Sequence, residues 1–226
     1  AARAAQPCAH APTGAGVGLA VGPAGGSGVG AADGRGVGAD GEASCDTDVS
    51  ENPSSDNGCT SAGAAYVYTR SGAAWAFEAY VKAPNAGSND RFGDALALSG
   101  DTLAVRAYRE DSCSTSISTT ADTGSGCSDA GAVYVYTRTG TTWSLEAYVK
   151  APNAGPFDYF GGSVAVYDDT LVVGAEGEDG CSTSTSSTVD TGNGCNANGA
   201  VYVVHPPCAN GQFADFSLAV DYCTAC

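Results

Sequence analysis

Side chains that could act as a catalytic base are scarce in this sequence of 226 residues. Its two histidines, His10 and His205, lie in irregular stretches near the chain ends. Hydrolysis by a nucleophile and a base needs a histidine beside a serine or cysteine, with a carboxylate that orients it. A paired-carboxylate mechanism needs two acids in a shaped pocket, but the close spacing of Glu176, Glu178 and Asp179 is more typical of a loop rim. We therefore expect no enzymatic activity.

Cysteine carries a second kind of chemistry. Ten cysteines occur without the facing Cys-x-x-Cys pairs of a zinc site, and six of them form three pairs that each enclose thirteen residues. The pairs are Cys45 with Cys59, Cys113 with Cys127, and Cys181 with Cys195. Local disulfides, each contributing ~3 kcal/mol, are the structural interpretation, and reactive or metal-binding thiols are the alternative. Because disulfides persist outside the cytosol, the sequence favours an extracellular protein.

Hydroxyl groups fill the loops between the paired cysteines. Serine and threonine occupy eight of thirteen positions in Ser114–Gly126, and again in Ser182–Gly194. Such a composition cannot form a core, so the loops are either solvated turns or carriers of O-linked sugar. The candidate acceptors are Ser114, Thr115, Ser116, Thr119, Thr120, Ser182, Thr183, Ser184 and Thr185.

The net charge of the chain excludes one class of binding partner. The chain has 25 acidic and 9 basic residues, a formal net charge of −16, and therefore lacks the phosphate-neutralising patch that nucleic-acid binding uses. No run approaches the ~20 apolar residues of a membrane-spanning helix. We predict no nucleic-acid partner and no membrane span. Methionine is absent and residues 1–5 lack the apolar core of a signal peptide, so we expect the chain to begin inside a longer precursor.

A repeat of 68 residues dominates the sequence. Gly63–Arg70 recurs as Gly131–Arg138, and 19 of the 25 residues in Gly63–Gly87 are identical in Gly131–Gly155. A third, shorter copy occurs at Gly199–Val204. Repeats of this length indicate structural units that bury their faces against their neighbours. We expect an irregular segment at 1–18, repeat units at 19–87, 88–155 and 156–205, and a separate C-terminal segment at 206–226.

Short strands and turn residues make up each unit. Period-2 alternation with β-branched and aromatic residues predicts strands at Gly161–Tyr167, Thr170–Gly174, Ala132–Arg138 and Trp143–Lys150. Helical periodicity is absent. The sequence predicts an all-β fold with four antiparallel strands per unit.

Aromatic residues and lysines recur in step with the repeat. The aromatic set is Tyr66, Tyr134, Tyr202, Trp75 and Trp143. A sugar-binding surface is one interpretation, and packing between units fits the periodicity better. Lys82 and Lys150, the only lysines, occur once per unit. Pairing each lysine with an acid of a neighbouring unit would help to set the stacking.

The order of motifs in each unit resembles a known repeat. Phe92-Gly93 and Phe160-Gly161 each precede a hydrophobic strand, an Arg-Ala or Gly-Ala pair, an acidic loop and a Gly-Ala-x-Tyr-Val strand. This arrangement resembles the FG-GAP repeats of integrin-like β-propellers over roughly residues 27–204. Departures are Ala24-Gly25 in the first unit, the missing proline after Gly-Ala, and the cysteine-bracketed insertions. The resemblance implies four-stranded blades around an axis, and about three blades are too few for the four to eight of a closed propeller.

The FG-GAP resemblance implies a candidate ion, and a separate resemblance implies a second module at the C-terminus. FG-GAP domains often hold calcium in acidic loops, where a hard cation takes six to eight oxygen ligands. The candidate ligands here are Asp46, Asp48, Glu176, Glu178 and Asp179, and a solvated acidic face is the alternative. Cys208–Cys226 resembles the start of an ephrin-receptor-like cysteine-rich repeat, which implies a Cys208–Cys223 disulfide. Cys8 and Cys226 would then pair with each other, with another chain, or with sequence not included here.

These observations predict a non-enzymatic extracellular protein with a structural or adhesive role. Because a three-blade array leaves unpaired surfaces, self-association into a surface fibre or matrix is the main hypothesis. The first alternative is a ligand-binding propeller module for a protein or glycan, with calcium as the candidate ion. The second alternative is an accessory domain of an enzyme outside this chain.

Overall fold

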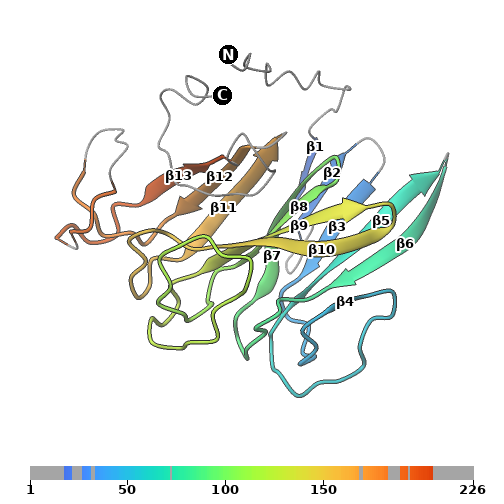
Figure 1. Cartoon of the computed structure of the whole chain (residues 1–226), viewed down its shortest axis with the longest axis horizontal. Coiled ribbons are helices and arrows are strands. Elements are labelled where there is room, and N and C mark those ends of the chain that lie inside the picture. The colour runs from blue at the N-terminus through green and yellow to red at the C-terminus, as the bar shows by residue number, and fades with distance from the viewer. Residues whose placement is uncertain are drawn as a thin grey trace, which may run out of the picture.

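The protein consists of three antiparallel sheets that lie side by side (Figure 1). The computed structural model describes residues 18–21, 27–31, 34–71, 73–167, 170–182, 189–192 and 194–205. In this part of the chain every regular element is a strand, and no helix is long and apolar enough to cross a membrane. The predicted all-β fold is confirmed.

Sheet A belongs to the first repeat unit and has the strand order β1-β2-β3-β5-β6-β4. Its strands are β1 (Gly18–Val21), β2 (Ser27–Ala31), β3 (Gly34–Ala39), β4 (Val49–Ser50), β5 (Ala64–Ser71) and β6 (Ala74–Val81). The sequence predicts four strands for this unit, and the additional β1 and β4 pair with the outer edges of β2 and β6.

Sheets B and C repeat the same plan with fewer additions. Sheet B has the order β10-β9-β8-β7 and consists of β7 (Phe92–Ser99), β8 (Thr102–Ala107), β9 (Ala132–Thr139) and β10 (Thr142–Val149). Sheet C has the order β11-β12-β13 and consists of β11 (Phe160–Tyr167), β12 (Thr170–Ala175) and β13 (Ala200–Val204). The observed bounds lie within one residue of the four predicted strands.

Each sheet has two chemically different faces because side chains alternate along a strand. In sheet B, Tyr134 and Tyr136 project from one face, and Val133 and Val135 from the other. We call the first the Tyr face and the second the Val face, and use the same names for the equivalent faces of sheets A and C. Both faces of sheet B are buried, which explains why β9 is apolar at nearly every position.

Two hydrophobic cores join the three sheets. In the first, Ala65, Val67, Ala79 and Val81 on the Val face of sheet A pack with Leu103, Val105, Tyr134 and Tyr136 on the Tyr face of sheet B. In the second, Ala104, Val133, Val135 and Ala147 on the Val face of sheet B pack with Leu171, Val173, Tyr202 and Val204 on the Tyr face of sheet C. The chain therefore makes the same face-to-face contact twice, always Val face against the next Tyr face.

Main-chain hydrogen bonds fix the segment of chain that leads from one sheet to the next. The segment entering β7 runs beside the turn before β5, where Asn89 N donates to Thr60 O at 2.8 Å and Phe92 N donates to Ala62 O at 3.0 Å. The ring of Phe92 packs against Tyr134 with centroids 5.3 Å apart. The equivalent Phe160 packs against Tyr202, also at 5.3 Å. The Phe-Gly motif thus inserts its aromatic ring into the core and its backbone against the preceding sheet.

Candidate functional site

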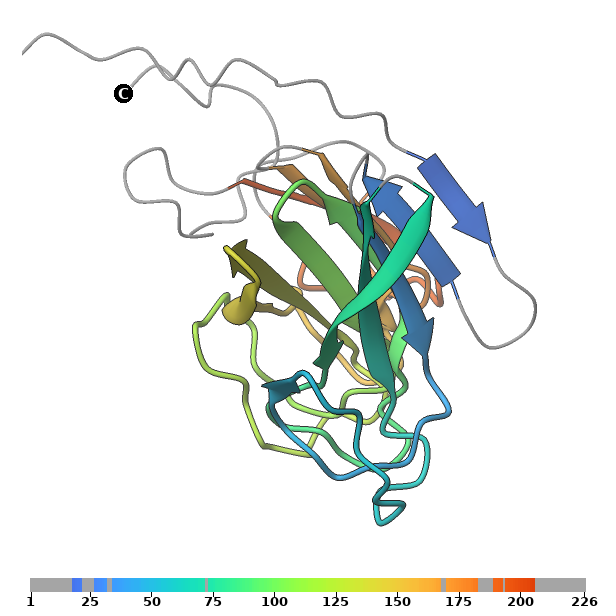
Figure 2. The same ribbon diagram turned by 90° about the vertical axis from the view of Figure 1, so that its right-hand side faces the viewer.

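The three cysteine pairs form disulfides, as their spacing predicts. The loops closed by the first two disulfides project from the same end of sheets A and B (Figures 1 and 2). Each loop also has a hydrophobic anchor or a strand contact. Ile117 packs against the second core, and Ser118 forms an antiparallel bridge with Tyr148 of β10. Three disulfides indicate an oxidising environment.

Removal of one disulfide should lower stability without changing the fold. The double variant Cys113→Ala and Cys127→Ala opens a loop with a sequence separation of 14 residues, which we expect to lower the free energy of unfolding by ~3 kcal/mol. Urea denaturation followed by circular dichroism measures the change. An unchanged midpoint would contradict a stabilising role for the disulfide, and the Ile117 and Ser118 contacts would then hold the loop alone.

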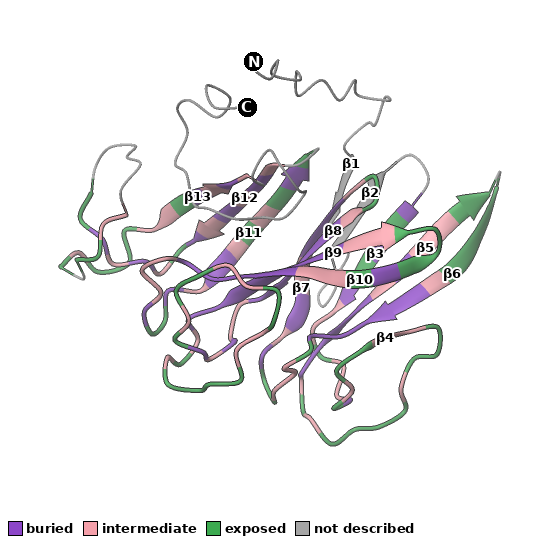
Figure 3. Ribbon diagram, viewed as in Figure 1, coloured by how far each residue is buried: buried purple, intermediate pink, exposed green. Residues whose placement is uncertain are grey.

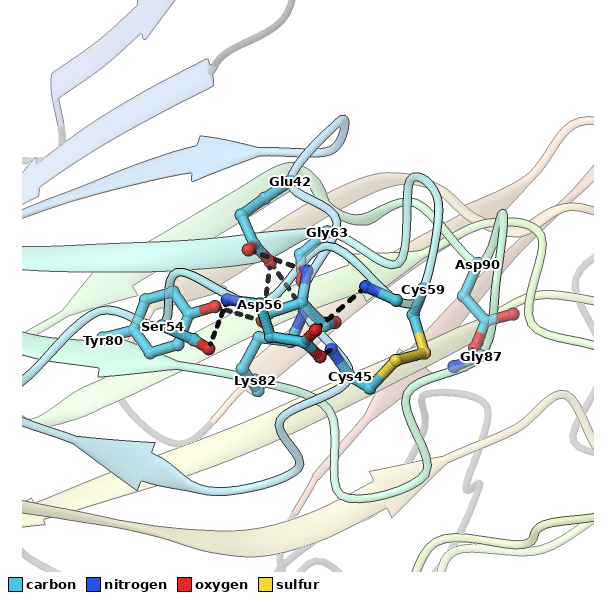
Figure 4. Close-up of a disulfide and its surroundings, with 12 residues drawn as sticks. Glu42, Cys45, Ser54, Asp56, Cys59, Gly63, Tyr80, Lys82, Gly87 and Asp90 are labelled. Carbon is cyan, nitrogen blue, oxygen red and sulfur yellow. Dashed lines mark hydrogen bonds and ion pairs between the residues drawn. A yellow bond between two sulfur atoms is a disulfide. The ribbon is translucent and has the colours of Figure 1, made fainter.

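A buried lysine anchors each of the first two loops. Lys82 Nζ donates to Glu42 Oε2 at 2.8 Å, Ser44 O at 2.9 Å and Gly63 O at 2.6 Å, beside the Cys45–Cys59 disulfide (Figure 4). Burial alone would raise the pKa of Glu42, but the Lys82 and Ser44 hydrogen bonds bring it below its ordinary value. These hydrogen bonds hold the ends of the Cys45–Cys59 loop against the residue that follows β6.

Lys150 repeats this arrangement in sheet B. Its Nζ donates to Glu110 Oε2 at 2.8 Å, and both side chains are almost fully buried. Burial lowers the pKa of Lys150, and the Glu110 charge opposes that shift. The predicted pairing of Lys82 and Lys150 with an acid of a neighbouring unit is wrong: both lysines pair within their own unit, because the loop that carries the acid folds back over the same sheet.

Asparagine side chains instead connect one unit to the next. Asn85 Nδ2 donates to Glu110 Oε1 at 3.1 Å, and its Oδ1 accepts from Tyr134 OH at 2.6 Å. Asn153 makes the equivalent contacts with Glu178 and Tyr202. Both asparagines belong to Ala-Pro-Asn-Ala-Gly segments, which follow the last long strand of one unit and link it to the next sheet. Their identical recurrence next to the repeat tyrosines was the signal for this role.

The outer edges of sheets A and B share a charged contact. Glu78 lies at a β-bulge in β6, which aims its carboxylate at the next sheet. Trp143 Nε1 donates to Glu78 Oε1 at 2.7 Å, and Arg138 Nη1 lies 3.3 Å from the same oxygen. Arg138 also stacks over the Trp143 ring at 5.5 Å. Trp143 therefore packs between units, as the periodicity favours.

Two buried aspartates lie in the links between sheets. Asp90 Oδ2 accepts from Gly87 N at 2.8 Å, and Asp158 Oδ2 accepts from Gly155 N at 2.6 Å. Burial raises the pKa of Asp90 to about 7, against the Gly87 hydrogen bond and with further repulsion from Glu110 and Asp111. Burial likewise raises the pKa of Asp158 to about 6.

The Asp90→Asn variant should become more stable than the parent protein as the pH rises from 4 to 8. Folded Asp90 holds its proton up to about pH 7, whereas the unfolded chain loses it near pH 4. This aspartate therefore stabilises the fold below pH 4, and its contribution is lost as the pH rises through 7. Asparagine keeps the oxygen acceptor for Gly87 and carries no charge.

Thermal unfolding of both proteins across this pH range measures the effect. We expect equal stability at pH 4 and an advantage for the variant on the order of 3 kcal/mol at pH 8. Asp158→Asn provides a parallel case whose advantage should level off about one pH unit lower and be smaller, because the folded-state pKa of Asp158 is raised only to about 6. A difference between Asp90→Asn and the parent that does not vary with pH would contradict the burial of a titrating carboxyl group.

The acidic candidates for a calcium site do not converge. Asp46 and Asp48 lie in the loop of sheet A, whereas Glu176, Glu178 and Asp179 follow β12 in sheet C. Glu178 already accepts from Asn153 Nδ2 and Gly180 N, and Asp179 accepts from Ala197 N. Within the described ranges no group of three or more His, Cys, Asp or Glu side chains is arranged to hold a metal ion. Calcium binding stays a prediction.

The hydroxyl-rich loops present most of their described acceptors to solvent. The exposed hydroxyls are those of Thr115, Ser116, Thr119, Thr120 and Ser182. Ser114 is half-buried, and Thr183, Ser184 and Thr185 lie outside the described residues. His205 contacts Thr170 Oγ1 at 3.2 Å through Nδ1, whereas His10 is outside the described residues.

The first and last sheets each expose the face that the interior contacts bury (Figure 3). On the Tyr face of sheet A, Trp75 is 44% exposed, whereas its counterpart Trp143 in sheet B is 3% exposed. On the Val face of sheet C, Val201 is 63% exposed, whereas its counterpart Val133 is fully buried. These two faces are candidate interaction surfaces of the described structure.

Comparison with known families identifies the repeat. The FG-GAP repeat matches residues 75–136 and 143–204, which together make up more than half of the chain. The protein belongs to the FG-GAP repeat family. The three sheets are therefore propeller blades, with sheets A, B and C as consecutive blades. No curated protein matched the chain in a sequence search.

The FG-GAP match explains why the two glycine motifs recur. Sheets B and C each begin with a Phe-Gly strand. The glycine before the Gly-Ala-x-Tyr-Val strand of one blade lies against the Phe-Gly backbone of the next blade, Gly63 against Phe92 and Gly131 against Phe160. The match ends at residue 204 and gives no support to an ephrin-receptor-like repeat. That segment and the Cys208–Cys223 pair lie outside the described residues.

Proposed function

We propose that this FG-GAP repeat protein is a non-enzymatic, extracellular structural component that self-assembles into a fibre or matrix. The uncovered blade faces at the two ends of the three-blade array carry the proposal. Exposed apolar sheet faces indicate association, because they are costly to leave in water. The three disulfides support an extracellular location, where such bonds persist.

Light scattering coupled to size-exclusion chromatography, together with negative-stain microscopy, tests this function on the purified chain. We expect species larger than the monomer whose population rises with protein concentration, and elongated or sheet-like particles. A monodisperse monomer up to millimolar concentration would overturn the proposal.

The hydroxyl-rich loops support a glycan-coated outer surface for such an assembly. Their exposed serine and threonine side chains lie on loops that contribute little to either core. Mass spectrometry of the peptides that contain residues 114–120 and 182–185, prepared from the native source, decides this point. Hexose-containing mass additions are expected, and unmodified masses would exclude the modification.

Two cavities favour ligand binding as a second candidate function. A cavity of about 450 Å³ lies on the open side of sheet C, and another of about 290 Å³ lies between the first cysteine loop and β10. The second is lined by Asp48, Tyr136, Trp143 and Ser144, a mixture of polar and aromatic groups that suits a sugar. Glycan-array binding with and without a calcium chelator measures it. Absence of binding would remove this candidate, and equal binding in chelator would remove its calcium dependence.

We also propose that the C-terminal segment begins a cysteine-rich module with a Cys208–Cys223 disulfide. The support is the resemblance of Cys208–Cys226 to the start of an ephrin-receptor-like cysteine-rich repeat. Peptide mapping under non-reducing conditions is expected to recover this pair, and any other pairing of Cys208 would contradict it.

A further inference from the structure

The described structure leaves one blade face uncovered at each end of the array. Inside the chain, the Val face of one blade packs on the Tyr face of the next, once between sheets A and B and once between sheets B and C. The Tyr face of sheet A and the Val face of sheet C have no such partner among the described residues. They lie at opposite ends of the blade array (Figure 3).

The 68-residue repeat allows each exposed residue to be compared with its buried counterparts. On the Val face, Val201 is 63% exposed, whereas Ala65 and Val133 at the equivalent positions are fully buried. Tyr167 of the same face is 57% exposed. The side chains that a following blade would cover therefore retain their apolar character in sheet C.

The Tyr face of sheet A shows the same relationship. Val37 is 42% exposed, whereas Val105 and Val173 at the equivalent positions are fully buried. Tyr66 and Tyr68 are half-buried, whereas the equivalent Tyr134 and Tyr136 are almost fully buried. The register of β3 with β5 places Val37 directly beside Tyr66, so these side chains form one continuous apolar patch.

A cavity marks the position where the next blade would pack on sheet C. Gly174 and Gly199 line the cavity of about 450 Å³. Their counterparts in sheet A, Gly38 and Gly63, lie directly against the backbone of the Phe-Gly strand of sheet B. The cavity is therefore the unfilled equivalent of a contact that the chain makes between sheets A and B.

We propose that a second copy of this chain covers these faces head to tail, with the Tyr face of its sheet A packed on the Val face of sheet C. This proposal rests on the proposed self-assembly and names the surfaces that mediate it. The contact reproduces the geometry that the same residues make twice within the chain. It joins two different surfaces, so it can close into a ring or extend into a filament.

The charges of the protein predict how this contact depends on salt. Two of the nine basic residues, Arg35 and Arg70, stack over Trp75 on the Tyr face of sheet A. Glu176, of opposite charge, lines the cavity on the Val face of sheet C. The net charge of −16 nevertheless repels two copies at long range. Added salt screens that repulsion and leaves the apolar contact intact, so association should strengthen between 0.02 M and 0.5 M salt.

Two variants that each block one face provide the test. Val37→Arg places a charge in the Tyr face of sheet A, and Val201→Arg places one in the Val face of sheet C. Each variant alone should associate more than about 30-fold more weakly than the parent protein. A 1:1 mixture should form a dimer of one copy of each, because the two chains together retain one intact pair of faces. Sedimentation velocity measures all four samples.

The controls separate folding from association. Both positions are exposed within a single chain, so the circular dichroism and the thermal midpoint of each variant should match those of the parent. Phe157→Arg is the matched control, because Phe157 is 55% exposed but lies in the link between sheets B and C. This variant should associate like the parent protein.

Three outcomes would overturn the contact. A mixture that stays monomeric would contradict it. Parent-like association of only one of the two variants would also contradict it, because it indicates a contact between two identical faces. Parent association that the variants do not weaken would place the interface elsewhere. The parent protein could instead form a closed dimer of six blades, with the 1:1 mixture of variants also forming a dimer. That result would support the head-to-tail contact and contradict fibre assembly, so the two proposals can fail separately.

Discussion

The Gly131→Ala variant is expected to lose about 4 kcal/mol of stability, a large effect for the addition of a single methyl group. A β-carbon at Gly131 would overlap the backbone carbonyl of Phe160. The residue also has a φ of +82°, which L side chains rarely adopt. The neighbouring backbone cannot move away, because Phe160 N is bonded to Ala130 O at 2.9 Å. The crossing from sheet B to sheet C would have to open.

Gly140→Ala is the matched control. Gly140 lies in the same blade with a φ of +66°, but nothing lies within 4 Å of an added β-carbon. Its substitution should cost only ~1–2 kcal/mol of backbone strain. Chemical denaturation of the two variants measures the difference, which isolates the clash with Phe160. Equal losses would show that backbone strain alone, and not the close approach of two blades, requires the repeat glycine.

The second large effect is expected for Lys150→Met, which should lower the free energy of unfolding by about 3–5 kcal/mol. The substitution leaves the carboxylate of Glu110 buried without its cation, at a position where the side chain is 2% exposed. Asn85 and Ser112 still donate to Glu110, but neither carries a charge. Because Glu110 joins the loop, the outer strand and the link from sheet A, we expect the loss to affect the whole fold.

Two further variants establish the cause. Adding Glu110→Gln to Lys150→Met should recover part of the stability, because it removes the buried charge and keeps the oxygen that accepts from Ser112 or Asn85. Lys82→Met should cost less than Lys150→Met, since its partner Glu42 is 14% exposed and water can solvate it. Urea denaturation at pH 7 ranks the four proteins. A double variant less stable than Lys150→Met would show that lost packing, and not the unpaired charge, dominates.

The distance between contacting residues along the chain explains which contacts of the candidate site the sequence predicts. Loop disulfides were predictable because each cysteine pair lies close together on the chain, so that loop closure is local. The lysine pairing was not, because Glu42 and Glu110 lie 40 residues before their lysines and reach them only when the loop folds back. The partners of Asn85 and Asn153 belong to the next unit, so they become neighbours only after two blades pack.

A comparison of strands β5 and β9 shows which properties follow from the local sequence and which depend on tertiary packing. Their sequences, AAYVYTRS and AVYVYTRT, are nearly identical, and both form strands of eight residues. Tyr134 and Tyr136 are buried in sheet B, whereas Tyr66 and Tyr68 in sheet A are only half-buried. The strands, their turns and their disulfides follow from local alternation, turn chemistry and short loop closure, which the sequence contains in full. Which face is covered depends on a neighbouring blade, and this was decided only by the tertiary structure because blade packing joins residues of different repeats.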